Sequence, residues 1–287
     1  MRKATPVVLL FVLCGQAIAD KAISAAGVTV RVKGQSGKMT MTLPGDNGTT
    51  TDIEVQMAAL RQLDASGNML GGGGNEKHSF ESFATQSFSF SEPLAATYKG
   101  LNVTTVTFES TLVGSSRLKV ETMIFQEAGG FSVGADVLNV TAGTIKFNVE
   151  LGNWSWCGSD AACKGASGTG ATVELDISVG PQGGGSLASK GDSKAFDLGG
   201  GSELIMLNTY STDGGSSWLT MPEGYPRNNG STFTLHFPRW AGTLLYDPLV
   251  SAGGSGGGAG DGSTSAAAAA VDRRVPALLA ALAWAAL

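Results

Sequence analysis

Several kinds of residue are scarce in this chain, and each scarcity narrows what the protein can be. The 287 residues include two histidines, three cysteines and 15% charged side chains. With so few histidines and cysteines, the chain has few possible metal ligands and few residues that could form a nucleophile–base pair. We therefore expect neither a metal nor another cofactor. The net charge is −5, and no basic stretch offsets it, which argues against nucleic acid as a partner.

Helical periodicity is almost absent, and alternation of polar and apolar residues takes its place. In Thr144–Leu151 the residues Ile145, Phe147, Val149 and Leu151 alternate with polar ones, the pattern of a strand with one face in water. Similar stretches recur between glycine-rich turns, so we predict an all-β fold, a single antiparallel β-sandwich that is Ig-like or jelly-roll-like, over residues 20–250. The other main predicted strands are 27–33, 38–43, 53–57, 103–112, 118–125, 131–140, 171–179, 196–198, 203–210, 232–237 and 243–250; the stretch 57–63 could be a short helix.

Both ends of the chain carry targeting patterns. Residues 1–19 have a basic start, a short apolar run and a small-residue cleavage pattern, which predicts a secretory signal peptide. Residues 251–265 form a Gly/Ser-rich tether, and residues 266–287 combine a spacer with an apolar tail too short to span a bilayer. This end predicts a removed glycosylphosphatidylinositol (GPI) attachment signal, with the lipid on Gly262, Ser263 or Ser265.

Composition agrees with a secreted, cell-surface location. Loss of the two signals removes four basic side chains and one acidic one, which moves the formal charge from −5 to about −8. Cys14 leaves with the signal peptide, so Cys157 and Cys163 should form a disulfide in an oxidising compartment. A two-cysteine metal site lacks neighbouring ligands in the sequence. The N-glycosylation acceptors are Asn47, Asn102, Asn139, Asn153 and Asn229.

Catalytic patterns are weak, and a binding module is the better supported function. A carbohydrate-active hydrolase could draw its carboxylates from Glu150, Glu174, Asp176 or Glu203, but all four alternate with apolar residues as on solvated strands. The loop from Asp213 through Trp218 to Tyr225 carries two large aromatics that could stack on a sugar or simply close the core.

We therefore expect a non-enzymatic recognition or adhesion module on the extracellular face of the plasma membrane. Its partners would be the membrane, through the lipid anchor, and an extracellular glycan or surface protein. The alternatives are the hydrolase and a passive coat protein.

Two rules conflict after Leu151. Continued alternation would bury the acceptor Asn153 and expose Trp154 and Trp156. A β-bulge at Gly152 would reverse the phase, so that Asn153 faces solvent and both tryptophans face the core. The rival interpretation keeps the strand regular and exposes both tryptophans as a ligand platform.

Overall fold

The computed structural model describes residues 19–45, 48–71, 78–158, 163, 168–181, 187–190 and 194–251. The regular elements in these ranges are β-strands, and the strands pair antiparallel. The prediction of an all-β antiparallel sandwich is confirmed. Within the described part of the chain, no helix is long and apolar enough to cross a membrane. The predicted signal peptide, tether and attachment signal lie outside the described residues, apart from Ala19 and Ser251.

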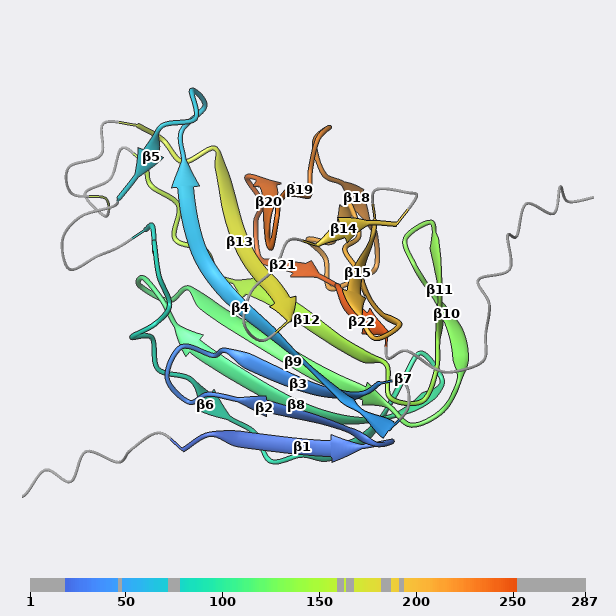
Figure 1. Cartoon of the computed structure of the whole chain (residues 1–287). Coiled ribbons are helices and arrows are strands. Elements are labelled where there is room, and N and C mark those ends of the chain that lie inside the picture. The colour runs from blue at the N-terminus through green and yellow to red at the C-terminus, as the bar shows by residue number, and fades with distance from the viewer. Residues whose placement is uncertain are drawn as a thin grey trace, which may run out of the picture. The chain divides into compact units, whose positions relative to one another are not determined.

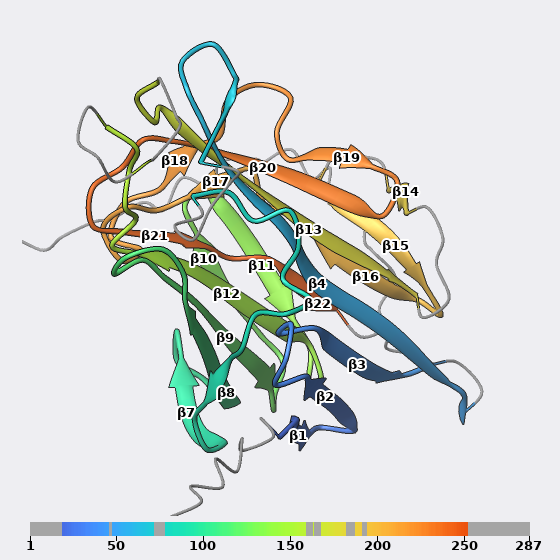
Figure 2. The same ribbon diagram turned by 90° about the vertical axis from the view of Figure 1, so that its left-hand side faces the viewer.

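Two large sheets form the layers of the sandwich (Figures 1 and 2). In the first sheet the strand order is β1-β2-β3-β4-β13-β20-β19, and β5 pairs with β4. Its strands are β1 (Lys21–Ala25), β2 (Val28–Val32), β3 (Met39–Pro44), β4 (Thr50–Leu63), β5 (Met69–Leu70), β13 (Thr172–Pro181), β19 (Arg227–Asn229) and β20 (Thr232–Pro238).

The second sheet has the order β14-β15-β16-β22-β12-β9-β8-β6, with β21 beside β12 and β7 beside β8. Its strands are β6 (Ser89–Phe90), β7 (Leu94–Tyr98), β8 (Leu101–Thr111), β9 (Arg117–Phe125), β12 (Ile145–Gly152), β14 (Ala188–Ser189), β15 (Ala195–Gly199), β16 (Ser202–Ile205), β21 (Thr243–Tyr246) and β22 (Leu249–Ser251). Two small ribbons complete the fold: β10 (Gly129–Val133) with β11 (Asp136–Val140), and β17 (Thr209–Tyr210) with β18 (Leu219–Thr220).

The main core lies between the two sheets and is built from the apolar phases of their strands. Ile145, Phe147, Val149 and Leu151 of β12 are fully buried there, as their alternation predicted. They share this core with residues of β13 and β20 such as Leu175. Burial of one apolar face from each sheet is the main free-energy gain of such a fold.

A second, smaller core covers the opposite face of β12 and its neighbours. It joins the β10–β11 hairpin to outward-facing residues of β8, β9 and β22, and the hairpin stands beside β22 in Figure 1. The prediction that Lys146 and Asn148 face water is wrong, because both are buried, and Glu150 is half-buried. The alternating pattern of a single strand does not show whether another part of the chain packs over the face that carries its polar residues. The members of the second core are Val103, Met123, Phe125, Phe131, Val133, Leu138, Val140, Leu207 and Leu249.

The stretch 57–63 is strand, so the helical alternative is wrong. It is the second half of the 14-residue strand β4, which pairs with β13 along its length. The register shifts between Asp176 and Ile177, where their partners are Ala59 and Met57, so Ala58 is an extra residue in β4. This bulge explains the misleading local pattern, because buried positions change phase there and Ala59 and Leu60 are both buried.

Some strand boundaries also differ from the prediction. The predicted strand 131–140 is two strands of a hairpin that turns at Gly134, where φ is 59°. The predicted strand 243–250 is interrupted at Asp247 and Pro248, between β21 and β22. Strand β1 was not predicted. The first two differences lie where one or two residues interrupt an otherwise continuous alternating pattern.

After β12 the alternation of inward and outward side chains is reversed, as we predicted from the conflict between the two rules at Asn153. Asn153 is exposed, Trp154 is buried and Trp156 is half-buried, with its ring packed edge-on against Trp240. The rival interpretation, which exposes both tryptophans, is wrong. The reversal occurs one residue later than predicted: β12 keeps its register to Gly152, and Asn153 itself has a φ of 51°. Asparagine is one of the few side chains that readily adopts this left-handed conformation.

Gln62 connects the first sheet to the segment that follows β12. Its Oε1 accepts hydrogen bonds from Trp154 Nε1 at 2.9 Å and from the Cys157 backbone N–H at 3.2 Å. The residue is fully buried, and its Nε2 has no partner in the described chain. Cys157 and Cys163 form the predicted disulfide beside this link. One amide side chain therefore holds the Trp154–Cys157 segment against β4.

Candidate functional site

The loop that was predicted to bind a ligand places its three named residues in different surroundings. Asp213 is exposed, and its carboxylate accepts hydrogen bonds from the Ser211 hydroxyl, 2.8 Å away, and from the backbone and hydroxyl of Ser217. The Ser217 hydrogen bonds lower the pKa of Asp213 to about 2. Asp213 therefore holds its own turn in shape, and its oxygens are occupied by that turn.

Trp218 anchors the same loop to the β10–β11 hairpin. Its side chain is half-buried against the second core, and a Cβ placed on Gly134 would lie 3.1 Å from the Trp218 Cβ. The glycine at this turn is what permits the close approach. Much of the indole surface is thus already used for packing, which favours the structural interpretation of Trp218 over a free stacking platform.

The side chain of Tyr225 lies against the outer face of the first sheet. Its hydroxyl donates to Glu174 Oε1 on β13 at 3.1 Å, and its ring lies 4.8 Å from the imidazole of His236 on β20. The Arg227 guanidinium lies 5.4 Å from the ring centroid. Partial burial, followed by the bond to Glu174, raises the pKa of Tyr225. The side chain is half-buried but held in one orientation by neighbours from two strands.

Charged groups continue from Tyr225 along the outer face of β4, β13 and β20. Arg61 donates to Asp176 and lies 3.9 Å from Glu174, and the Thr234 hydroxyl donates to Asp176 Oδ1 at 2.8 Å. The hydrogen bond with Asp176 raises the pKa of Arg61. His236 is half-buried, with Nδ1 3.4 Å from Glu174 Oε1. Both carboxylates are therefore already paired with protein groups.

The four carboxylates of the hydrolase alternative do not meet at one place. Glu174 and Asp176 are neighbours on the first sheet, whereas Glu150 and Glu203 belong to the second. Glu150 pairs with Lys119 at 3.0 Å, and Glu203 lies 3.9 Å from Lys190. Only Glu174 and Asp176 stand next to each other on one face, and Arg61 already forms ion pairs with both.

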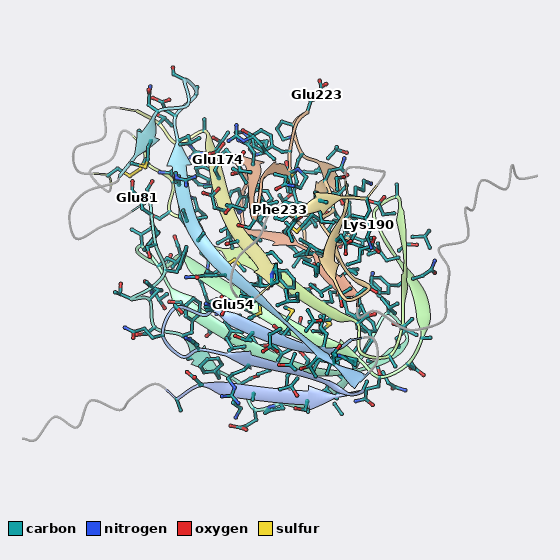
Figure 3. The ribbon with its side chains drawn as sticks, viewed as in Figure 1. Glu54, Glu81, Glu174, Lys190, Glu223 and Phe233 are labelled. Atoms are coloured by element: carbon teal, nitrogen blue, oxygen red, sulfur yellow. A yellow bond between two sulfur atoms is a disulfide. The ribbon has the colours of Figure 1, made fainter. Side chains whose placement is uncertain are left out.

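A cleft of about 500 Å³ lies beside Tyr225 and is the best-formed binding geometry on this loop. Its walls combine the apolar surfaces of Met221, Pro222 and Pro226 with the polar ends of Lys194, Asn208 and Glu223. Figure 3 shows Glu223 at the rim, pointing away from the sheets. This size and this mixture of ring, apolar and polar surface are typical of sites for small polar ligands such as saccharides.

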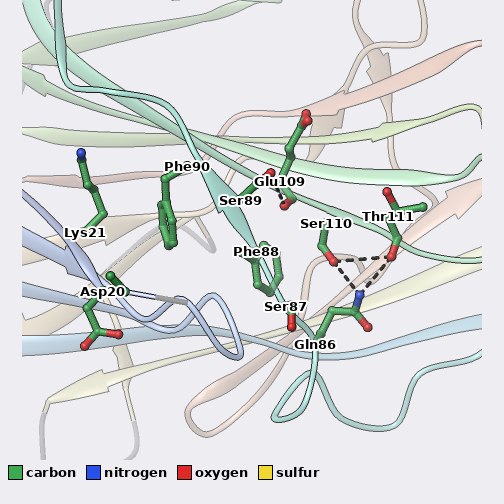
Figure 4. Close-up of a pocket in the computed structure, with 11 residues that line it drawn as sticks. Asp20, Lys21, Gln86, Ser87, Phe88, Ser89, Phe90, Glu109, Ser110 and Thr111 are labelled. Carbon is green, nitrogen blue, oxygen red and sulfur yellow. Dashed lines mark hydrogen bonds between the residues drawn. The ribbon is translucent and has the colours of Figure 1, made fainter. Parts of the chain in front are cut away.

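A larger recess, of about 810 Å³, lies at the opposite edge of the sandwich (Figure 4). Strand β1 of the first sheet and β6 of the second border it, and Phe88 and Phe90 supply its apolar wall. Gln86 Nε2 donates to the Thr111 carbonyl at 3.0 Å on one side. Ala19, the first described residue, contributes to the lining, so cleavage before Asp20 would alter this recess.

His78 and the disulfide meet in space although they are distant in sequence. His78 Nδ1 lies 2.7 Å from the Ser155 carbonyl oxygen, and one ring nitrogen of His78 and the two sulfurs lie within 4.8 Å of one another. The expectation that no third ligand type stands near the cysteines is therefore wrong. The sulfurs are bonded to each other, however, and metal sites of this kind use thiolates.

The modification sites can be placed only in part. Asn102, Asn139, Asn153 and Asn229 are all exposed, which attachment of a glycan requires. Asn47 lies outside the described residues, as do Gly262, Ser263 and Ser265.

Comparison with known proteins gives a family and no structural relative. No solved structure matches the chain. Residues 15–188, more than half of the chain, match the family described as acidic skeletal organic matrix protein. The matched segment includes β1 to β13 and the disulfide, whereas the Tyr225 loop lies beyond it. The chain belongs to the acidic skeletal organic matrix protein family.

Proposed function

We propose that the protein is a GPI-anchored extracellular glycoprotein whose β-sandwich acts as a non-catalytic recognition or adhesion module. The family description adds a setting, a skeletal organic matrix, in which a tethered adhesive domain would hold matrix material at the cell surface. The observation that carries the recognition role is the cleft beside Tyr225, where a ring fixed by Glu174 and His236 borders polar side chains. Its ligand class would be saccharide, since aromatic faces stack on sugar rings and polar rims select hydroxyl patterns.

The anchor is tested on cells that express the full chain. A phosphatidylinositol-specific phospholipase should release the protein into the medium, because only the lipid would hold it. Protein that stays on the membrane after treatment, or that is fully secreted without it, would contradict the anchor.

Recognition is tested with the released protein on a glycan array and on matrix polysaccharide. Tyr225→Ala should weaken saccharide binding by about 1–3 kcal/mol, roughly 5- to 150-fold, whereas Tyr225→Phe should retain most of it. Leu94→Ala is the matched control, since Leu94 is 63% exposed on β7 of the other sheet. Equal binding by Tyr225→Ala and wild type would remove the cleft from the proposal, and no binding to any surface would favour the passive coat protein.

A further inference from the structure

A buried polar group lies on the outer face of β12, and the proposed function makes no use of it. Lys146 is fully buried, Asn148 is 8% exposed, and Asp247 is 1% exposed. Among the described lysines, Lys146 is the only one in the buried class. Long charged side chains almost never occupy such positions unless a neighbour compensates them.

The three side chains come together from β12 and from the break between β21 and β22. Lys146 Nζ lies 3.0 Å from Asp247 Oδ2 and also donates to Asn148 Oδ1. Asp247 Oδ1 has no hydrogen-bond partner in the described chain, although it is buried. The Tyr98 ring covers Nζ from the other side, with its centroid 5.3 Å away. An amine, a carboxamide and a carboxyl group thus share one dry pocket.

Burial changes the protonation chemistry of this pocket. Desolvation lowers the pKa of Lys146, and the nearby Asp247 only partly opposes it. An ion pair this deep gains less from mutual attraction than it loses by leaving water, unless all remaining polar atoms are satisfied. Here Asp247 Oδ1 has no partner of ordinary hydrogen-bond geometry in the described chain, and the Tyr98 hydroxyl is the one nearby donor: burial and then Asp247 raise the pKa of Tyr98. Loss of a proton from Nζ would leave a neutral, nucleophilic amine at this position.

We propose that Lys146 and Asn148 join in the folded domain through an amide bond between Nζ and Cγ, with Asp247 as the proton carrier. Residues two apart on a strand are about 6.7 Å apart and point to the same face, a span that a lysine and an asparagine side chain cover together. Lys146 Nζ contacts Asn148 Oδ1, the oxygen bonded to the carbon that it would attack.

The reaction needs no external reagent. Asp247 takes one proton from the Lys146 ammonium, and the free amine adds to Cγ of Asn148. The C–N bond to the original amide nitrogen then breaks as that nitrogen receives the proton released by Nζ. Ammonia leaves and takes the proton held by Asp247, so the group departs as ammonium. Fixed proximity of amine and amide supplies the rate that the same groups lack in solution.

The product removes a buried charge and does not close a long loop. Both linked residues belong to β12, so the bond adds little chain-entropy stabilisation. Its gain is that a neutral amide replaces an ammonium in a buried site. Lys119, on the same face of neighbouring β9, offers the comparison: it pairs with Glu150, remains partly exposed and contacts no carboxamide, so it should stay free.

Mass spectrometry of the purified full-length protein tests the bond directly. After enzymatic removal of glycans and cleavage at glutamate, residues 128–150 form one peptide that contains both Lys146 and Asn148. The linked peptide should weigh about 17 Da less than its sequence, the mass of the one ammonia that is displaced, or about 16 Da less where glycan removal has converted Asn139 to aspartate. Trypsin should fail to cut after Lys146 but should cut after Lys119.

Variants distinguish the proposed amide bond from other reactions that release ammonia. Lys146→Arg keeps the cation and should show the full mass. General acid–base help is worth about 10²–10⁴-fold, so freshly purified Asp247→Asn should be largely unlinked. Wild-type peptide at full mass overturns the proposal, and so does a lighter peptide that trypsin still cuts after Lys146, because that would be a change of Asn148 alone. The wild-type result decides even if a variant fails to fold. Complete linkage in Asp247→Asn would overturn the role of Asp247.

Discussion

Replacement of Gln62 by leucine tests whether one buried amide holds the two layers together near the disulfide. Gln62→Leu keeps an apolar volume in the site but removes the acceptor for Trp154 Nε1 and for the Cys157 N–H. Each buried donor left without a partner costs about 1–3 kcal/mol. The variant also removes Gln62 Nε2, which has no partner itself, so one such cost is recovered. The net loss should be about 1–3 kcal/mol, which for a domain of this size lowers Tm by roughly 2–12 °C.

Thermal and urea unfolding of the purified protein measure this loss. Gln56→Leu is the matched control, a half-buried glutamine on the same strand, and should change stability by less than about 0.5 kcal/mol. In a Trp154→Phe background, Gln62→Leu leaves only the Cys157 N–H unpaired, so its cost should fall to near zero. An equal cost in both backgrounds, or no cost in either, would refute the role given to Gln62.

Three other expectations concern titration, redox state and glycans. All four tyrosines have a raised pKa with burial as the first cause, so absorbance at the tyrosinate band should rise little at pH 10 until denaturant is added. The neutral forms are favoured by folding, and stability should therefore fall as pH rises above the unfolded value near 10; half-ionised native protein at pH 10 would contradict this. Non-reducing peptide maps should join Cys157 to Cys163, and reduction should cost about 2 kcal/mol for so short a loop; two free thiols, or an intermolecular link, would count against it. Peptide-N-glycosidase should lower the mass of the released chain, and Asn139→Gln, at an exposed position of β11, should reduce that shift with little effect on Tm; an unchanged mass would show that the acceptors are unused.

The fold class could be predicted because it depends on local alternation, which β12, β13 and β20 display clearly. The disulfide could be predicted because only Cys157 and Cys163 remain if the predicted signal peptide removes Cys14. The burial of Lys146 could not be predicted. The hairpin that builds the second core comes from residues 129–140, and the sequence of β12 contains no pattern that indicates this contact.

The surroundings of Tyr225 depend on the same kind of distant contact. The sequence placed Tyr225 on a loop with aromatic character, but its partners Glu174 and His236 stand on two strands whose pairing no local pattern fixes. The reversal at Asn153 was foreseen because two rules disagreed there. Its exact position was missed because both Gly and Asn can adopt the left-handed conformation.

The position of Asn229 bears on how copies of the protein would behave when crowded on one surface. Strand β19 is the last strand of the first sheet among the described residues, and its three residues are exposed. Leu187 bonds to Gly230 and Asn228 at one end of this edge, and the other backbone groups of the described edge could pair with an approaching strand. A glycan on Asn229 would stand across that edge with a hydrated, bulky shield. Neighbouring molecules would then be kept from merging their sheets into insoluble ribbons, and a dense coat could remain a collection of separate domains.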